Sequence, residues 1–141
     1  MKKGKLADTS VKIWDDEDAN EVHSELYYGK FMDDHLKLSL VEALHLVDRG
    51  ELEIEVEGET KDKDELFHLF SDIDDDFEHK YAVYTDLRER GYVVKTGFKF
   101  GAHFRVYPRV VNPYKEGPKE DREHTKWIVH AVPENYNQDY Q

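Results

Sequence analysis

The sequence predicts an α+β protein of two lobes, a small α/β lobe followed by a lobe in which helices pack on a β-sheet. Apolar and acidic residues alternate through residues 52–56, which is typical of a half-exposed strand. Apolar side chains then recur every three or four positions from residue 66 to residue 87, which indicates amphipathic helix. Further strand-like segments follow Gly91. Helical and strand periods therefore succeed each other along the chain, as expected for this class.

The first lobe is predicted to begin with a strand over residues 5–14 that turns near Ala7 and Asp8. The acidic residues 15–20 suit the positive N-terminal end of a helix. Apolar residues continue at helical spacing after them, and Gly29 is the expected C-cap of that helix.

A second helix is predicted at the capping-box pattern of Ser39 and Glu42, directly after a short alternating strand at residues 36–40. Gly50 is expected to stop this helix before the strand over residues 52–56. The first lobe carries no recognisable catalytic constellation in its sequence.

Residues 58–64 are predicted to form a polar joint. The helical period that follows is either one long helix or two helices in series, broken near the acidic run 74–76 and closed by Gly91. Tyr81 and Tyr84 lie on its apolar stripe, so we expect both to face the core.

The second lobe is predicted to contain three strands, over residues 92–95, 98–107 and 124–132. We place the boundary between the lobes within the preceding helical segment. Residues 1–76 are then the first domain and residues 77–141 the second.

Charge is distributed unevenly along the 141 residues, whose net charge is −12. Residues 1–78 carry nine Lys or Arg and 24 Asp or Glu, whereas residues 79–130 carry 11 and six. An acidic front half and a basic back half suggest that a polyanionic partner meets only the second part. The alternative is that the acidic residues simply keep the first lobe in solution.

Composition excludes several classes of protein and site. The chain has no cysteine, which excludes disulfide frameworks, thiol nucleophiles and thiolate metal sites. No apolar run approaches the about 18 residues of a membrane span, and the N-terminus lacks the apolar centre of a signal peptide. The histidines form no metal-ligand pattern, and His68 and His79 are expected at the surface. We therefore expect a cytoplasmic protein with no membrane partner, metal or cofactor.

The segment at residues 97–107, GFKFGAHFRVY, presents a polar row opposite an aromatic one. One face is expected to be core, with Phe98, Phe100, Phe104 and Val106. The other is polar and partly cationic, with Lys99, Gly101, His103, Arg105 and Tyr107. Tyr107 at the end of this row is either a functional phenol or a capped edge tyrosine.

His124 stands at the entrance of the third predicted strand, in HTKWIVH. A hairpin between the two strands would bring it to Tyr107. A histidine and a tyrosine beside several cations can move protons around a phosphate, although a lone loop-edge histidine is more often a surface residue.

These segments resemble a known family. DLRERG, VKTGFKFG and FRVY occur in this order before HTKWIVHA, and together they resemble the catalytic domain of the archaeal tRNA-splicing endonucleases. YYGKF and LKLSLVEALHLVDRGELEIE resemble the N-terminal domain of that family. The resemblance extends from about Lys5 to Val132 and implies a C-terminal nuclease domain with a mixed β-sheet packed by helices.

The resemblance implies a reaction and two catalytic residues. The family cleaves precursor tRNA at intron junctions, commonly in a bulge-helix-bulge, without a metal, and leaves a 2′,3′-cyclic phosphate and a 5′-hydroxyl. Tyr107 matches its general base on the 2′-hydroxyl, and His124 matches its general acid for the departing 5′-oxygen. A tyrosine with a pKa near ~10 needs a nearby cation to act as a base, and a lysine fills this role in the family.

The family's lysine lies on a helix after the histidine strand, and Gln141 precedes that point in this sequence. We therefore expect the third catalytic group from a partner polypeptide or a C-terminal piece, with Lys126 as a less favoured substitute. The expected partners are precursor tRNA and other endonuclease subunits, in a homo- or hetero-oligomer. The alternative is a non-catalytic, structural or RNA-binding subunit. Candidate RNA-binding residues are Lys99, Arg105, Lys115, Lys119 and Lys126, although the loop that holds Lys115 and Lys119 could simply be solvated.

Overall fold

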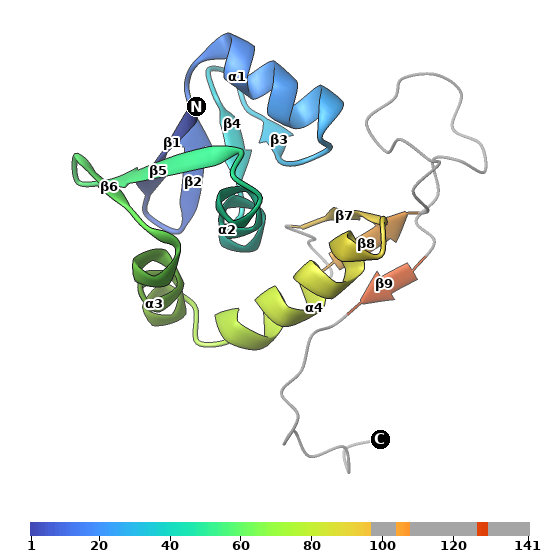
Figure 1. Ribbon diagram of the computed structural model, residues 1–141. Helices are drawn as coiled ribbons and strands as arrows, with labels where there is room; N and C mark the ends of the chain where they lie inside the picture. The colour runs from blue at the N-terminus through green and yellow to red at the C-terminus, as the bar shows by residue number, and fades with distance from the viewer. Residues whose placement is uncertain (97–103, 108–126, 130–141) are drawn as a thin grey trace.

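The computed structural model describes residues 1–96, 104–107 and 127–129, which form two β-sheets and the helices that join them (Figure 1). The elements are β1 (Lys2–Ala7), β2 (Ser10–Ile13), α1 (Asp16–Asn20), η1 (Glu21–Glu25), β3 (Lys30–Phe31), β4 (Leu36–Leu38), α2 (Leu40–Asp48), β5 (Leu52–Val56), β6 (Glu59–Lys61), α3 (Lys63–Ile73), α4 (Phe77–Glu89), β7 (Val93–Lys95), β8 (Phe104–Tyr107) and β9 (Trp127–Val129). The predicted α+β class is confirmed.

The N-terminal sheet has six strands in the order β3-β4-β2-β1-β5-β6. The neighbours β1 and β5 are parallel, and the other pairs are antiparallel. The predicted turn near Ala7 and Asp8 is confirmed as the link between β1 and β2, where Asp8 has a positive φ of 58°. The N-terminal sheet is mixed because the chain crosses through α2 from β4 to β5, and β5 runs parallel to β1.

The first helix ends earlier than predicted. Asp15 caps α1 by accepting a hydrogen bond from the Asp18 amide at 2.9 Å, as the acidic start suggested, but the helical segment ends at Glu25 with Leu26 as its C-cap. The prediction of Gly29 as its C-cap is wrong. Gly29 is needed instead for close packing, because a Cβ at this position would lie 2.9 Å from Leu38 Cδ2, with φ at +84°.

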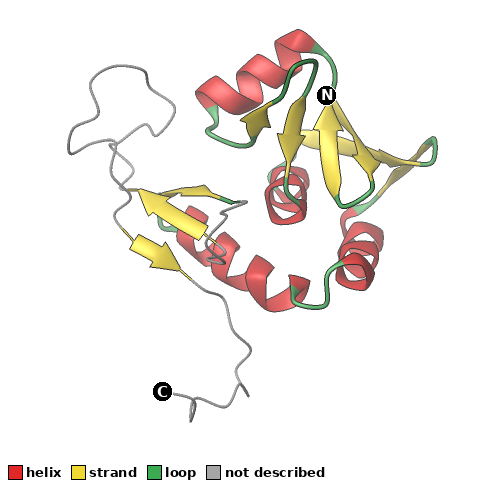
Figure 2. Cartoon of the chain, turned by 180° about the vertical axis from the view of Figure 1, so that it is seen from behind, coloured by secondary structure: helices red, strands yellow, loops and turns green. Residues whose placement is uncertain are grey.

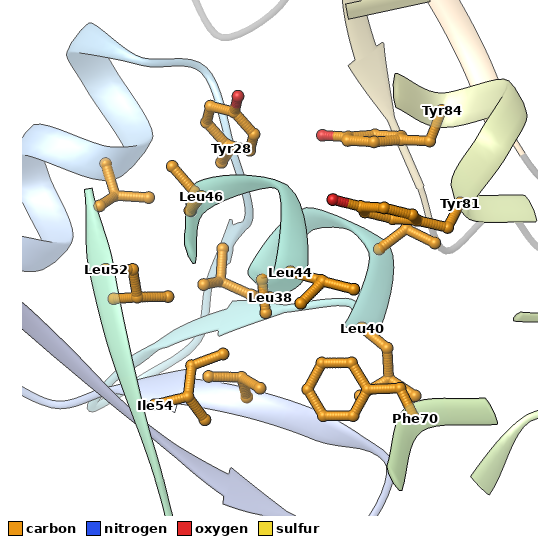
Figure 3. Packing of buried hydrophobic residues seen from close by; sticks show 14 of the residues in the cluster. Tyr28, Leu38, Leu40, Leu44, Leu46, Leu52, Ile54, Phe70, Tyr81 and Tyr84 are labelled. Carbon is orange, nitrogen blue, oxygen red and sulfur yellow. The ribbon is translucent and has the colours of Figure 1, made fainter. Parts of the chain in front are cut away.

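Helix α2 forms the centre of the N-terminal core. The predicted capping contact is present, since the Ser39 amide donates to the Glu42 carboxylate at 2.9 Å. Side chains of α2 pack between the sheet and α4, and Leu44 and Leu46 are among those fully buried (Figure 3). Burial on both sides explains why α2 is apolar around most of its circumference.

The predicted polar joint at residues 58–64 is wrong in part. Residues 59–61 form β6, which pairs with β5 in an antiparallel hairpin. Glu57 and Gly58 between them both have positive φ, 52° and 86°, as a two-residue hairpin turn requires. The sequence EVEGETK therefore held a hairpin signal that its charge obscured.

The long helical period is two helices, α3 and α4, which confirms the alternative with a break at the acidic run. Asp62 and Glu65 form a reciprocal capping box at the start of α3. Tyr81 and Tyr84 are buried as predicted, and in Figure 3 both rings lie beside α2. Burial raises the pKa of Tyr81 to about 12.

The described C-terminal strands form a three-stranded antiparallel sheet in the order β7-β8-β9. All three lie within the predicted strand ranges, and the rest of residues 98–107 and 124–132 lies outside the described residues. Figure 2 shows this sheet apart from the six-stranded one, with α4 leading to it from α3.

One hydrophobic core crosses the predicted boundary between residues 76 and 77. Leu44 of α2, Tyr84 of α4 and Phe104 and Val106 of β8 belong to the same cluster of buried residues. The Tyr84 and Phe104 rings pack 5.6 Å apart. In the part of the chain that the structure describes, no helix has the length and apolar character to cross a membrane.

Candidate active site

Tyr107 ends strand β8, directly opposite Val93 of β7. Alternation along the strand places this residue on a polar, partly cationic face. The structure buries it, with 3% of its surface exposed. Arg105, two residues earlier on the same face, is half-buried. Tyr107 therefore shares a strand face with the half-buried Arg105 but is packed against the protein and not open to solvent.

A cleft of about 450 Å³ lies between the two sheets beside this strand. Lys95 and Arg105, which are opposite each other on β7 and β8, form its C-terminal wall. Lys30 and Lys37 of the N-terminal sheet line the other side. Four cationic side chains from both lobes thus meet around one cavity, in which polyanions are favoured.

The second predicted catalytic residue, His124, lies outside the described residues, as do Lys99, Lys115, Lys119 and Lys126. Strand β9 begins at Trp127, three residues after His124, and pairs with β8 in the antiparallel sense. This hairpin is the connection that the predicted meeting of Tyr107 and His124 requires.

Sequence reasoning missed a chain of hydrogen bonds that joins the lobes, from the buried Tyr28 to the exposed Glu89. The Tyr28 hydroxyl lies 2.8 Å from His45 Nδ1, and His45 Nε2 lies 3.2 Å from a carboxylate oxygen of Glu89. Because a carboxylate only accepts, Nε2 donates to Glu89 and Nδ1 accepts from Tyr28. His45 is fully buried, and burial lowers its pKa, with the Glu89 hydrogen bond opposing. The chain therefore holds a neutral imidazole.

A second polar cluster surrounds Glu42, which is almost completely buried. Its carboxylate accepts from the amides of Gly29 and Ser39 at 2.8 and 2.9 Å, and from the Ser39 hydroxyl at 3.0 Å. The Thr96 hydroxyl, just beyond β7, lies 2.9 Å from the Ser39 hydroxyl and 3.3 Å from Glu42. These contacts fix the edge of β7 against the start of α2, beside the cleft.

Arg88 completes the junction between the lobes. Its guanidinium lies 3.8 Å from the centre of the Tyr28 ring and donates to the Tyr84 hydroxyl at 3.2 Å and to the Tyr27 carbonyl. Burial raises the pKa of Tyr84 well above its ordinary value, so its hydroxyl stays protonated. Glu42 and His45 on the apolar stretch of α2 were the only sequence signal for this junction, because polar residues within such a stretch need buried partners.

Among the described residues, no group of three or more His, Asp or Glu side chains could hold a metal ion. The described residues that line the cleft include four cations and one carboxylate, that of Glu42. The chemistry available among these residues is proton transfer and charge stabilisation.

Comparison with known proteins decides the family. Residues 2–67 match the model of the tRNA intron endonuclease N-terminal domain, and residues 77–141 match that of the tRNA intron endonuclease catalytic C-terminal domain. A tRNA-splicing endonuclease of Methanothermobacter thermautotrophicus is 39% identical over 132 residues, which cover 94% of this chain and 72% of that protein. The chain belongs to the tRNA intron endonuclease family.

Other members of the tRNA intron endonuclease family are longer than this sequence. The tRNA-splicing endonuclease of Thermococcus onnurineus is 41% identical over 116 residues, 82% of this chain and 62% of that protein. The one from Methanococcoides burtonii is 41% identical over 125 residues, 87% of this chain and 34% of that protein. The chain thus spans about a third to two thirds of these two relatives.

Proposed function

We propose that this chain is a subunit of a tRNA-splicing endonuclease that cleaves precursor tRNA at its intron junctions. The observation that carries the proposal is the matching of both domains of the tRNA intron endonuclease family along the chain. The antiparallel pairing of β8 and β9 beside a cationic cleft supports it, since Tyr107 lies at one end of β8 and His124 stands three residues before the start of β9.

The proposed reaction is an internal transesterification without a metal. Tyr107 accepts the proton of the 2′-hydroxyl as that oxygen attacks the adjacent phosphorus, and His124 gives a proton to the departing 5′-oxygen. The products are a 2′,3′-cyclic phosphate and a 5′-hydroxyl. Arg105, on the same face of β8 as Tyr107, supplies positive charge that favours the phenolate and the charged phosphorane.

A single-turnover cleavage assay on precursor tRNA tests these roles. Because the resemblance puts the family's lysine on a helix after the His124 strand, the assay includes a polypeptide that carries that helix. Tyr107→Phe and His124→Ala should each lower the cleavage rate by about 10²–10⁴-fold, the range of a lost general acid or base. His68→Ala, at an exposed position of α3, is the matched control and should cleave at the wild-type rate.

Two further measurements sharpen the assay. Excess EDTA should leave the rate unchanged, and the 5′ fragment should end in a cyclic phosphate. Wild-type rates in both variants, with circular dichroism spectra that match the wild type, would refute the assignment of Tyr107 and His124.

A non-catalytic RNA-binding subunit is the second candidate, and the burial of Tyr107 favours it, since a base must reach its substrate. This reading predicts salt-dependent binding of precursor tRNA and no contribution to cleavage with any partner. A solvent-accessible Tyr107 in the assembled enzyme, seen as tyrosine iodination that precursor tRNA blocks, would exclude it.

A further inference from the structure

Four lysines occupy directly opposed positions on four adjacent strands of the N-terminal sheet. Lys5 of β1 pairs with Lys12 of β2, Lys12 pairs with Lys37 of β4, and Lys37 pairs with Lys30 of β3. We call these four residues the lysine row. Neighbouring strands are about 4.8 Å apart, so the row extends over about 14 Å.

The lysine row lies on the face of the sheet turned away from the core. Lys12 and Lys37 each stand between two buried neighbours, Val11 and Ile13 for the first. Since side chains alternate across a strand, the lysines project to the opposite side. Three of the four are exposed and Lys12 is half-buried, with its ammonium group 5.8 Å from the centre of the Trp14 ring.

Like charges directly opposite each other destabilise a sheet. Relief by a carboxylate is not seen here: among the described residues, no Asp or Glu forms an ion pair with the four lysines of the row. The lysines at residues 61, 63 and 80, in contrast, each have an acidic partner within 3.1 Å. The four opposed lysines therefore lower stability and have no counter-charge within the described chain. Such an arrangement is suited to binding an external polyanion.

The row leads into the cleft beside β8. Lys30 and Lys37 at its end line the cavity that Lys95 and Arg105 close from the other lobe. Phe31, with 43% of its surface exposed, also lines it, and Trp14 beside Lys12 is 48% exposed. A cationic track with accessible aromatic rings is the arrangement that binds a nucleic-acid strand, since rings stack on bases and lysines meet phosphates.

We propose that the lysine row binds the phosphodiester backbone of an RNA strand that passes through the cleft to the β8–β9 hairpin. The inference rests on the proposed function and assigns substrate binding to the N-terminal domain, whereas the charge distribution along the sequence suggested binding by the second part alone.

The test compares two triple variants that lose the same charge from the 141-residue chain. K12Q/K30Q/K37Q removes three lysines of the row, and K61Q/K63Q/K80Q removes three that have acidic partners. Binding to a precursor tRNA transcript is measured by filter retention between 50 and 300 mM salt. The row variant should bind about 100-fold more weakly at 0.1 M salt, with a log–log slope smaller by about two, because each single-strand phosphate contact contributes about 0.7 to that slope.

The control variant should bind as the wild type does, and K12R/K30R/K37R should retain affinity because it keeps the charge. Equal losses in the two Gln variants would mean that net charge alone matters and would overturn the proposal. Unchanged binding by the row variant, or binding of the wild type to phosphatidylserine vesicles but not to RNA, would overturn it as well.

A footprint independent of substitution completes the test. Bound precursor tRNA should protect Lys12, Lys30 and Lys37 from acetylation, with Lys61 and Lys63 labelled as in the free protein; an unchanged pattern refutes the inference. A wild-type chain that binds RNA through the row yet never contributes to cleavage contradicts only the proposed function.

Discussion

Polar side chains have opposite environments in two regions of the molecule, the junction between the lobes and the lysine row. At the junction, Glu42 and His45 are buried and Arg88 is half-buried, and all three form hydrogen bonds. In the row, like charges stand opposite one another at the surface. Buried polar groups that form all their hydrogen bonds favour a single arrangement of the chain. Like charges that face each other at the surface are instead suited to binding a ligand of opposite charge. The following predictions test the junction half of this contrast.

The largest loss of stability is expected from Glu42→Ala. The change leaves the amides of Gly29 and Ser39 without their acceptor in a buried place, which should lower the free energy of unfolding by about 3 kcal/mol. Urea titration followed by circular dichroism measures this value. Glu25→Ala, at an exposed position of η1, is the control and should change it by less than about 0.5 kcal/mol. Equal effects would show that the Glu42 cluster contributes no more than surface charge.

A smaller loss is expected from Arg88→Lys, which keeps the charge but removes the planar guanidinium. Its stacking on Tyr28 and its bond to the Tyr84 hydroxyl should be lost, at a cost of about 2 kcal/mol. Arg90→Lys is a close control, because Arg90 is exposed and pairs only with Asp86 among the described residues. The same urea titration should find it within about 0.5 kcal/mol of the wild type. If Arg88→Lys left the free energy of unfolding unchanged, the role of the stacked guanidinium would be contradicted.

The smallest effect concerns pH. Since burial lowers the pKa of His45 in the folded protein, the unfolded chain binds the proton more readily. Stability is therefore fully present above the ordinary histidine pKa, near ~6.5, and falls as pH drops from there toward the lowered folded value. Thermal melts between pH 7.5 and 5.5 should show this decline, and His45→Gln should flatten it. Burial, and after it the charge of Lys95, also lower the pKa of His23. The parallel variant His23→Gln should therefore remove the part of the pH dependence of stability that comes from His23.

Local patterns predicted most of the fold, and the failures have physical causes. Alternation found β5, and helical spacing with an acidic break found α3 and α4, because each pattern acts within one element. Gly29 was misassigned since its role depends on Leu38 of a later strand. Strand β6 was missed because its residues are polar, and the charge of the segment obscured the two-residue turn that joins it to β5.

The residues of the candidate site could be predicted only where sequence motifs resembled those of a known family. Tyr107 and His124 came from motifs, while the burial of Tyr107 depends on packing that strand alternation cannot report. The lysine row was invisible for a different reason. Its members are separated by up to 32 positions and come together only through strand register, within a segment whose summed charge is strongly negative.

The core that runs from α2 through α4 to β8 has a consequence for how the chain folds. Leu44, Tyr84 and Phe104 lie in one buried cluster, so the hydrophobic core is continuous between the two matched domains. Unfolding should be a single cooperative event, in which amide protons of α2 and α4 exchange with solvent through the same global opening. Two domains in sequence would then behave as one folding unit, and a chain cut after residue 76 would yield halves that regain order only on meeting each other.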